Sequence, residues 1–352
     1  MNGPDSSSPS DVLLEVKDLH VSFTTYGGEV QAVRGVSLTL RRGETLAIVG
    51  ESGCGKSVTA RSLMRLLPPQ TSKIRQGSIR FQGRELTGLT EKQMREIRGS
   101  AITMIFQDAM TALNPTITIG EQIMEGIIRH QKLSRSEARK QAVEMLELVG
   151  ISNPESRLKQ HLHQFSGGMR QRIMIAIAAV GQPSVLIADE PTTALDVTIQ
   201  AQILDLFKLL QRKTGVSIIM ITHDLGVVAN IADRVNVMYA GKVVESGTVD
   251  EVFRHPQHPY TKGLLASMPR LDSDRNTPLQ SIPGTPPDLF APPKGCAFAA
   301  RCPLAMEVCA DFQPDTTSLS GGHGVACWLQ DARVKQMLPP PDANTFIRSA
   351  IG

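Results

Sequence analysis

The stretch GESGCGKS at residues 50–57 decides the fold of this chain. It follows an apolar run at residues 46–49, which is typical of a strand buried on both faces. Gly50, Gly53 and Gly55 allow backbone conformations that larger residues resist, so the chain can wrap around an anion. The spacing matches G-x-x-x-x-G-K-[ST], in which backbone N–H groups and a helix start point toward phosphates. The stretch therefore predicts a nucleotide-binding domain of the α/β class.

Two side chains of this loop are predicted to contact the nucleotide directly. Lys56 brings a full positive charge to the outer phosphates, and the Ser57 hydroxyl is placed to ligate Mg²⁺. Cys54 has no assigned role in the loop. The residues predicted to bind ATP in this segment are Gly50, Ser52, Gly53, Gly55, Lys56, Ser57 and Val58.

A second buried strand is predicted at residues 185–188, and it ends in the adjacent carboxylates Asp189 and Glu190. Alternate strand residues face opposite ways, so Asp189 is predicted to hold Mg²⁺ while Glu190 faces the water that attacks the terminal phosphate. Glu190 is thus the predicted general base. A solvated pair of acids at a strand end is the simpler explanation, but the glycine loop in the same chain disfavours it.

Two further polar residues end apolar stretches. His223 lies in ITHD at residues 221–224, after an apolar β-branched run, where ligand-facing groups gather in open α/β sheets. It is predicted to bond the terminal phosphate, although a histidine taken alone is often structural. Gln107 ends the apolar stretch at residues 102–106, and its amide is suited to contact Mg²⁺ or the attacking water. That role for Gln107 depends mainly on a family resemblance.

Together these motifs resemble those of the nucleotide-binding subunits of ABC transporters, over about residues 12–330. The resemblance implies that Gln107 couples the ATP site to membrane subunits, that residues 194–196 form the dimer-contact loop and that His223 is the switch histidine. In this family two such subunits meet head to tail. Each ATP is then held between the glycine loop of one subunit and a Ser-Gly-Gly signature of the other.

The signature is identified as Ser166, Gly167 and Gly168 in FSGGMRQR, residues 165–172. Ser166 is able to cap a helix predicted to begin near Met169, so that its positive end faces a partner's ATP. An ordinary capped helix is the alternative. Met169 stands where the commonest signature has Gln, and FSGGM resembles the peptide-importer branch.

The family resemblance also places an aromatic side chain on the adenine of ATP. Alternating residues at 13–23 and 30–40 predict antiparallel strands, and Phe23 matches the adenine position best. Tyr26 is the second candidate, and plain core packing explains either residue nearly as well.

The expected architecture is a RecA-like P-loop core with an antiparallel β subdomain, a helical insertion and a small cysteine-containing C-terminal domain. The ATPase domain is predicted at residues 12–255, with the insertion at about 112–182. A C-terminal domain of the oligopeptide-importer type is predicted at 256–335, where proline and glycine become frequent. Residues 1–11 and 336–352 are predicted to be tails, the first of them disordered.

The composition limits the classes of partner. Of 352 residues, 41% are hydrophobic, so the chain can bury a large core. The most apolar stretch, residues 173–188, is interrupted at 181–184 and falls short of the roughly 18 apolar residues of a spanning helix. Residues 1–10 lack the apolar centre of a signal peptide. The net charge is only +3, without a long basic run, so nucleic acid is not expected as a partner.

Four of the five cysteines gather in the C-terminal domain, at Cys296, Cys302, Cys309 and Cys327. In a reducing compartment such clustering favours a shared metal over disulfides. The gaps of five, six and seventeen residues are not the tight spacing of common zinc ribbons. The surrounding sequence resembles the C-terminal domain of oligopeptide and dipeptide importer ATPases, some of which hold a four-iron four-sulfur cluster. We therefore expect a 4Fe-4S cluster on these thiolates, with zinc or unligated thiols as alternatives.

The resemblance implies the ATPase subunit of a bacterial peptide importer, bound at the cytoplasmic face of the inner membrane. Its expected partners are a second, different ATPase subunit, two transmembrane permease subunits and an extracytoplasmic peptide-binding protein. Importers of nickel or glutathione use similar chains, so the substrate stays open. The alternative from another class is a soluble ABC ATPase acting in assembly or translation. A single glycine loop and a single signature disfavour it, since such factors often carry two.

Overall fold

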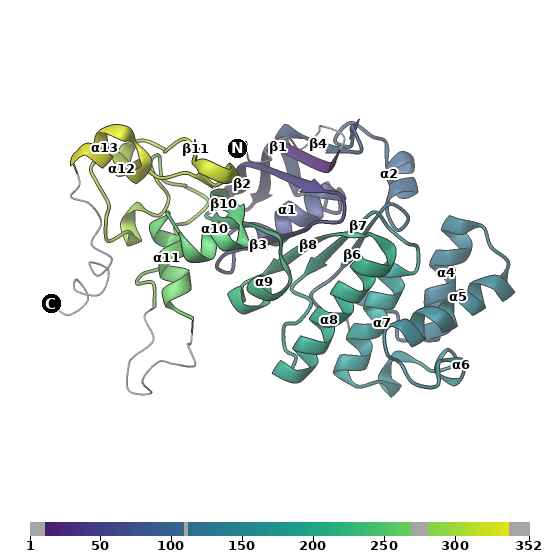
Figure 1. Ribbon diagram of the computed structural model, residues 1–352. Helices are drawn as coiled ribbons and strands as arrows, with labels where there is room; N and C mark the ends of the chain where they lie inside the picture. The colour runs from purple at the N-terminus through teal and green to yellow at the C-terminus, as the bar shows by residue number, and fades with distance from the viewer. Residues whose placement is uncertain (1–10, 109–111, 269–280, 338–352) are drawn as a thin grey trace. The chain divides into compact units, whose positions relative to one another are not determined.

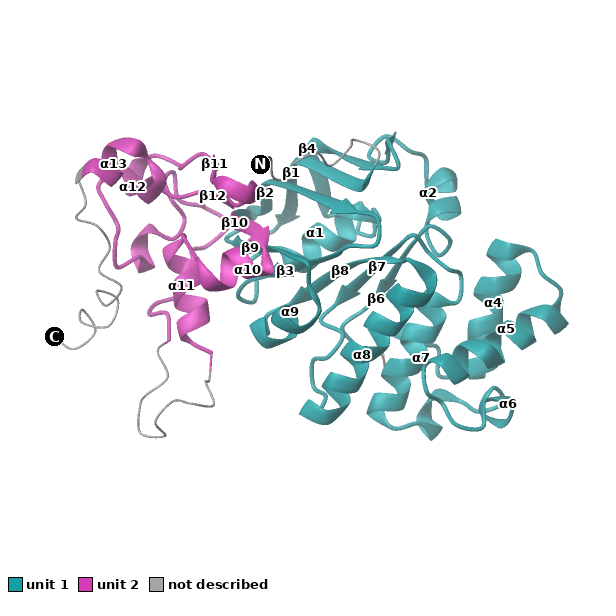
Figure 2. Ribbon diagram, in the orientation of Figure 1, with its two compact units in different colours: residues 1–243 teal, residues 244–352 magenta. Residues whose placement is uncertain are grey.

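The computed structural model describes residues 11–108, 112–268 and 281–337. They divide between two compact units, residues 1–243 and 244–352 (Figure 2). The predicted tails lie outside the described residues, apart from Asp11, Gln336 and Met337. Unit 2 starts at Val244 within β10 (Lys242–Thr248), ahead of the predicted boundary at residue 256, and Glu245 and Ser246 of β10 pair with β12 (Gly324–Val325).

An antiparallel sheet opens unit 1, with strand order β2-β1-β4-β5. β1 bends at Asp18, where the register shifts and φ is 47°. Gly77 of β4 crosses this bend so closely that a Cβ would lie 2.4 Å from the Asp18 carbonyl oxygen. The strands are β1 (Val12–Thr25), β2 (Gly28–Arg41), β4 (Ser72–Phe81) and β5 (Arg84–Glu85).

A parallel sheet forms the centre of unit 1, with the order β9-β3-β8-β7-β6 (Figure 1). Every residue of β3, β6, β7 and β8 is buried, which explains their continuous apolar sequences. The predicted α/β class is confirmed. The strands are β3 (Thr45–Val49), β6 (Ile102–Ile105), β7 (Val185–Asp189), β8 (Ser217–Thr222) and β9 (Arg234–Tyr239).

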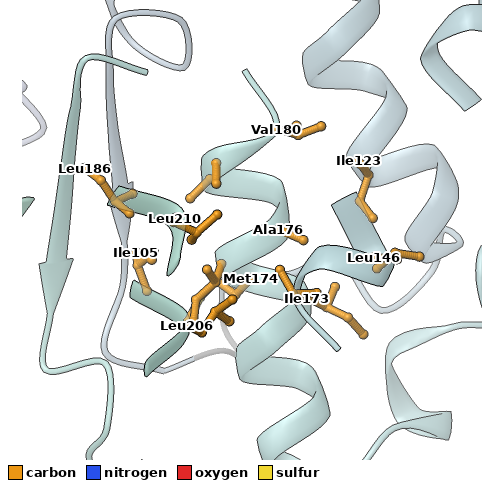
Figure 3. Close-up of a cluster of buried hydrophobic side chains, with 14 of the residues drawn as sticks. Ile105, Ile123, Leu146, Ile173, Met174, Ala176, Val180, Leu186, Leu206 and Leu210 are labelled. Carbon is orange, nitrogen blue, oxygen red and sulfur yellow. The ribbon is translucent and has the colours of Figure 1, made fainter. Parts of the chain in front are cut away.

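Alternate residues of β7 face two different hydrophobic clusters. Leu186 and Ala188 belong to a cluster with α4, α5, α7 and α8, part of which Figure 3 shows. Val185 and Ile187 belong to a second cluster, which contains α1 and the antiparallel sheet. The helices of unit 1 are α1 (Lys56–Leu63), α2 (Glu91–Ile97), α4 (Ile119–Gln131), α5 (Arg135–Leu148), α6 (Pro154–Arg157), a 3-10 turn (Leu162–Gln164), α7 (Gly167–Ala179), α8 (Val197–Thr214) and α9 (Leu225–Ile231).

Capping boxes mark where α4 and α5 begin. At the start of α5, the Ser134 N–H donates to Glu137 Oε2 at 2.9 Å, and the Glu137 N–H donates to Ser134 Oγ at 3.3 Å. Hydrogen bonding to Ser134 also lowers the pKa of Glu137. Thr118 and Glu121 form the same arrangement at the start of α4.

Unit 2 is held together by a buried carboxylate, that of Glu245 on β10. It accepts the backbone N–H groups of Gln257 at 2.7 Å and His258 at 3.0 Å, and His323 Nε2 lies 2.7 Å away. Both Glu245 and His323 are almost fully buried. The remaining elements are α10 (Val249–Arg254), α11 (Pro259–Ala266), 3-10 turns (Ala299–Arg301, Ser320–Gly322, Trp328–Gln330), α12 (Val308–Asp311), β11 (Thr317–Ser318) and α13 (Ala332–Met337).

Replacing Glu245 with Ala is expected to destabilise unit 2 by about 3 kcal/mol, because buried donors lose their acceptor. Trp328 is the single tryptophan of the chain and lies in this unit, so its fluorescence during urea unfolding reports on it selectively. E245Q keeps an acceptor oxygen and should lose less. The control is E307A, at an exposed position of the same unit. Equal unfolding midpoints for E245A and E307A would contradict this account.

Candidate active site

The loop at residues 50–57 connects β3 to α1 and has little space for side chains. Gly50 has φ 152° and Gly55 has φ 99°. A Cβ on Gly50 would lie 2.2 Å from the Met238 carbonyl oxygen, and one on Gly55 would lie 2.4 Å from that of Ala32. Both positions therefore require glycine. Ser52 and Gly53 lie exposed at the tip of the loop.

Lys56 is the first residue of α1 and is 5% exposed. Its Nζ donates to the carbonyl oxygens of Gly50 at 2.7 Å and Glu51 at 3.0 Å. The ammonium group is thus held inside the curve of the loop. Val58, the third residue of α1, packs against the second hydrophobic cluster.

Asp189 and Ser57 meet although they are far apart in sequence. The Ser57 hydroxyl donates to Asp189 Oδ1 at 2.8 Å. Asp189 is fully buried, and its other oxygen, Oδ2, has no hydrogen-bond partner. Burial raises the pKa of Asp189, only partly offset by the hydrogen bond from Ser57. A buried oxygen without a donor, beside a hydroxyl, is a set of ligands that suits Mg²⁺.

Glu190 lies beyond the end of β7, where φ is 48°. Gln107 Nε2 and Thr193 Oγ1 each donate to its Oε2 at 3.0 Å. His223 Nδ1 lies 3.4 Å from its Oε1. The structure thus brings the three predicted catalytic residues, Glu190, Gln107 and His223, to one place. Thr193 was missed by sequence reasoning, and its position three residues after Glu190 was the available signal.

Ser166 caps α7, as predicted, and its Oγ accepts the Met169 N–H at 3.4 Å. The helix begins at Gly167, earlier than expected, so both signature glycines lie in its first turn. Ser166 and Gly167 are exposed, and nothing lies within 4 Å of where a Cβ of Gly167 would stand. The buried Phe165 anchors the residue before the cap.

The two candidate aromatic residues differ in their surroundings. Phe23 is partly buried and packs against the second hydrophobic cluster. Tyr26 lies in the turn between β1 and β2, and its relative exposure of 113% shows that nothing covers it. Phe23 thus contributes to the core while part of it stays exposed, and Tyr26 does not contribute to the core.

The four C-terminal cysteines share one small cavity in unit 2, together with His258. His258 Nδ1 accepts the Tyr260 N–H at 3.0 Å, whereas its Nε2 has no hydrogen-bond partner. Burial lowers the pKa of His258 to about 3, so the ring is neutral and carries its proton on Nε2.

The predicted cluster on Cys296, Cys302, Cys309 and Cys327 is nevertheless contradicted. Among the described residues, no group of three or more His, Cys, Asp or Glu side chains is arranged to hold a metal ion. Burial raises the pKa of Cys302 to about 11 and that of Cys327 to about 12. The prediction of a 4Fe-4S cluster is therefore wrong, and the zinc alternative is not supported either.

Within the ranges that the structure describes, no helix combines the length and the apolar character needed to span a membrane.

Comparison with known families and structures gives consistent results. Residues 33–193 match the ABC transporter family, and residues 244–309 match the oligopeptide/dipeptide transporter C-terminal region. Among solved structures, the chain resembles the ATP-binding cassette MJ0796 in a dimeric post-hydrolysis state bound to ADP and phosphate. The TM-score is 0.61 at 26% identity, and the match covers 67% of this chain and 99% of the other.

Relatives of similar length share more of the sequence. The chain is 62% identical to the dipeptide transport ATP-binding protein DppD of Bacillus subtilis, over 94% of this chain and 99% of the relative. It is 52% identical to the oligopeptide transport ATP-binding protein OppD of Salmonella typhimurium, over 91% and 94%. Neither name indicates an iron-sulfur protein. The chain belongs to the ABC transporter ATPases, in the branch that carries the oligopeptide/dipeptide transporter C-terminal region.

Proposed function

We propose that this ABC ATPase powers the import of dipeptides or oligopeptides through a membrane transporter. The observation that carries the proposal is the convergence of Gln107, Thr193 and His223 on the Glu190 carboxylate, beside the Ser57–Asp189 pair. The peptide substrate is supported by the relatives named above and by the match of residues 244–309.

Ser57 and Asp189 are the residues that would hold Mg²⁺, with Gln107 as a further oxygen ligand. When bound, Mg²⁺ neutralises charge on the outer phosphates of ATP. Lys56 lies inside the same loop, and rotation of its ammonium group away from the loop carbonyls would bring it to these phosphates. The unpartnered oxygen of Asp189 supports this assignment.

Glu190 acts as the general base in this proposal. The donors Gln107 and Thr193 fix its Oε2, which leaves Oε1 to accept the proton of the attacking water. His223, next to Oε1, then bonds the terminal phosphate and responds to its loss. The adenine base is assigned to Phe23, with the exposed Tyr26 as the second candidate.

The signature residues Ser166, Gly167 and Gly168 are proposed to bind the ATP of a second subunit. Their exposure at a capped helix start supports this, because N–H groups there are free to bind an anion. A second, different ATPase subunit would complete the pair. We further propose two permease subunits, an extracytoplasmic peptide-binding protein and a peripheral location at the cytoplasmic face of the inner membrane.

Replacing Glu190 with Gln should lower the turnover of ATP by roughly 10²–10⁴-fold, since the amide cannot accept the water proton. ATP should remain bound and accumulate in a dimer, measured by size exclusion with radiolabelled nucleotide. E147Q, at an exposed position of α5, is the matched control. Undiminished turnover in E190Q would remove Glu190 as the base.

Replacing Asp189 with Asn should raise the melting temperature of the nucleotide-free protein, while abolishing its stabilisation by Mg²⁺ with ATP. Burial raises the pKa of Asp189, so this carboxyl contributes most to stability at low pH and loses that contribution as the pH rises through its folded pKa. A gain of about 1 kcal/mol corresponds to roughly 2–4 °C.

The advantage of D189N over the wild type should therefore be larger at pH 8 than at pH 5, measured by calorimetry. D205N, at an exposed position of α8, serves as the control for a neutralised aspartate. A nucleotide-free D189N that melts below the wild type at pH 8 would refute the assigned burial cost.

The transport proposal is tested by purifying the tagged full-length protein from detergent-solubilised native membranes and identifying its partners by mass spectrometry. Two permeases, a second ATPase and a peptide-binding protein are expected. Recovery with only ribosomal or assembly factors would overturn the transport function and leave the ATPase assignment intact.

A further inference from the structure

A hydrogen bond joins the start of α8 to the turn that carries His223. Gln200 Nε2, one turn into α8, donates to Asp224 Oδ2 at 3.0 Å. The two residues are 24 positions apart in sequence, and both are partly buried. Neither side chain belongs to the set that contacts Glu190.

Asp224 is fixed tightly by its neighbours. Its Oδ1 accepts the N–H groups of Gly226 at 2.8 Å and Val227 at 3.3 Å, which caps α9. Its own N–H donates to Thr222 Oγ1 at 3.0 Å. One carboxylate oxygen thus serves α9 while the other serves Gln200. The position of Asp224 determines where the preceding residue, His223, presents its ring.

The other end of this connection is equally constrained. Asp196 caps α8 through the Ile199 N–H at 2.9 Å, and the Gln200 N–H donates to the Asp196 carbonyl oxygen at 2.8 Å. Ahead of it, Ala194 has φ 63°, a conformation that is uncommon for a residue other than glycine. The Thr193 N–H donates to the Glu190 carbonyl oxygen at 3.2 Å. Residues 191–194 therefore form turns, and the chain passes through residues 195–196 directly into α8, which begins at Val197.

These contacts close a ring of residues. It runs from Glu190 along the backbone to Asp196 and Gln200, across the hydrogen bond to Asp224, and through His223 back to Glu190. Gln200 supplies the side chain that joins the dimer-contact segment, residues 194–196, to the histidine turn. If the start of α8 moves, the hydrogen bond between Gln200 and Asp224 lengthens unless the turn that carries His223 moves with it. The same holds if the histidine turn moves first.

We propose that Gln200 is a positioning residue that makes the dimer-contact segment and His223 move together. A second subunit that displaces residues 194–196 would then shift His223 relative to the terminal phosphate. This inference rests on the proposed roles of His223 and of the dimer contact. The amide suits this task because it donates to Asp224 without adding a charge beside Glu190.

The test compares steady-state ATP hydrolysis by Q200L, Q200E and the double variant Q200E/D224N. Leucine removes the donor at similar volume, and glutamate places a carboxylate against Asp224. The double variant exchanges the amide and the carboxylate, so the hydrogen bond can form again in the reverse direction, and the amide oxygen at position 224 can still cap α9. The single variants should lose roughly tenfold in kcat with the KM for ATP unchanged, and the lost hydrogen bond should lower the melting temperature by only a few degrees. The double variant should recover most of that loss.

Two controls separate this inference from the proposed function. Q141L makes the same substitution on α5, outside the ring, and should retain full turnover. H223A should lose turnover if His223 acts as proposed. If H223A loses activity while Q200L keeps it, the role of Gln200 is refuted and the proposed function stands. If H223A keeps full activity, the proposed role of His223 and the role of Gln200 are both refuted. A Q200L variant with a lowered melting temperature and unchanged kcat would show that Gln200 only stabilises the fold. That result would also refute the inference.

Discussion

The pleat of β7 is the constraint on which the active site depends. Its alternate residues face different hydrophobic clusters, so Asp189 continues the side of Ile187, where α1 and Ser57 lie. The backbone then adopts a left-handed conformation at Glu190. The Glu190 carboxylate consequently lies beside Gln107 and His223 and not beside Ser57. Two adjacent acids thereby receive different environments. One is buried with a raised pKa, and the other is oriented by donors.

This arrangement stores backbone strain at the site. Glu190 and Ala194 both have positive φ values, each of which costs of order 1–3 kcal/mol for a residue other than glycine. The hydrogen bonds from Gln107 and Thr193 to the Glu190 carboxylate help to offset that cost. The residues with positive φ, Glu190 and Ala194, lie directly ahead of α8. Gln200 on α8 therefore links this strained segment to Asp224 at the start of α9. A segment held in this way is suited to adopt a second arrangement when a partner binds.

Unit 2 depends on buried polar contacts more than on its strands, because β11 and β12 have only two residues each. A buried Glu245 organises three separate segments, and a neutral His258 lines the cysteine cavity. The four cysteines that cluster in the sequence line one cavity, but the metal cluster predicted on them was wrong. The clustering did not reveal whether they ionise, because burial in the folded unit sets the pKa of Cys302 and Cys327.

The sequence by itself determined the α/β class, the phosphate loop and the acids at the end of β7, since glycine spacing and strand alternation act over a few residues. Predicted catalytic residues from three strand ends met at Glu190, as parallel strands require. Only the tertiary structure decided the contact of Gln200 with Asp224 and the packing of Phe23 against the second hydrophobic cluster. Such contacts join distant segments, and no local pattern records which side chains the packed helices and strands bring within hydrogen-bonding distance.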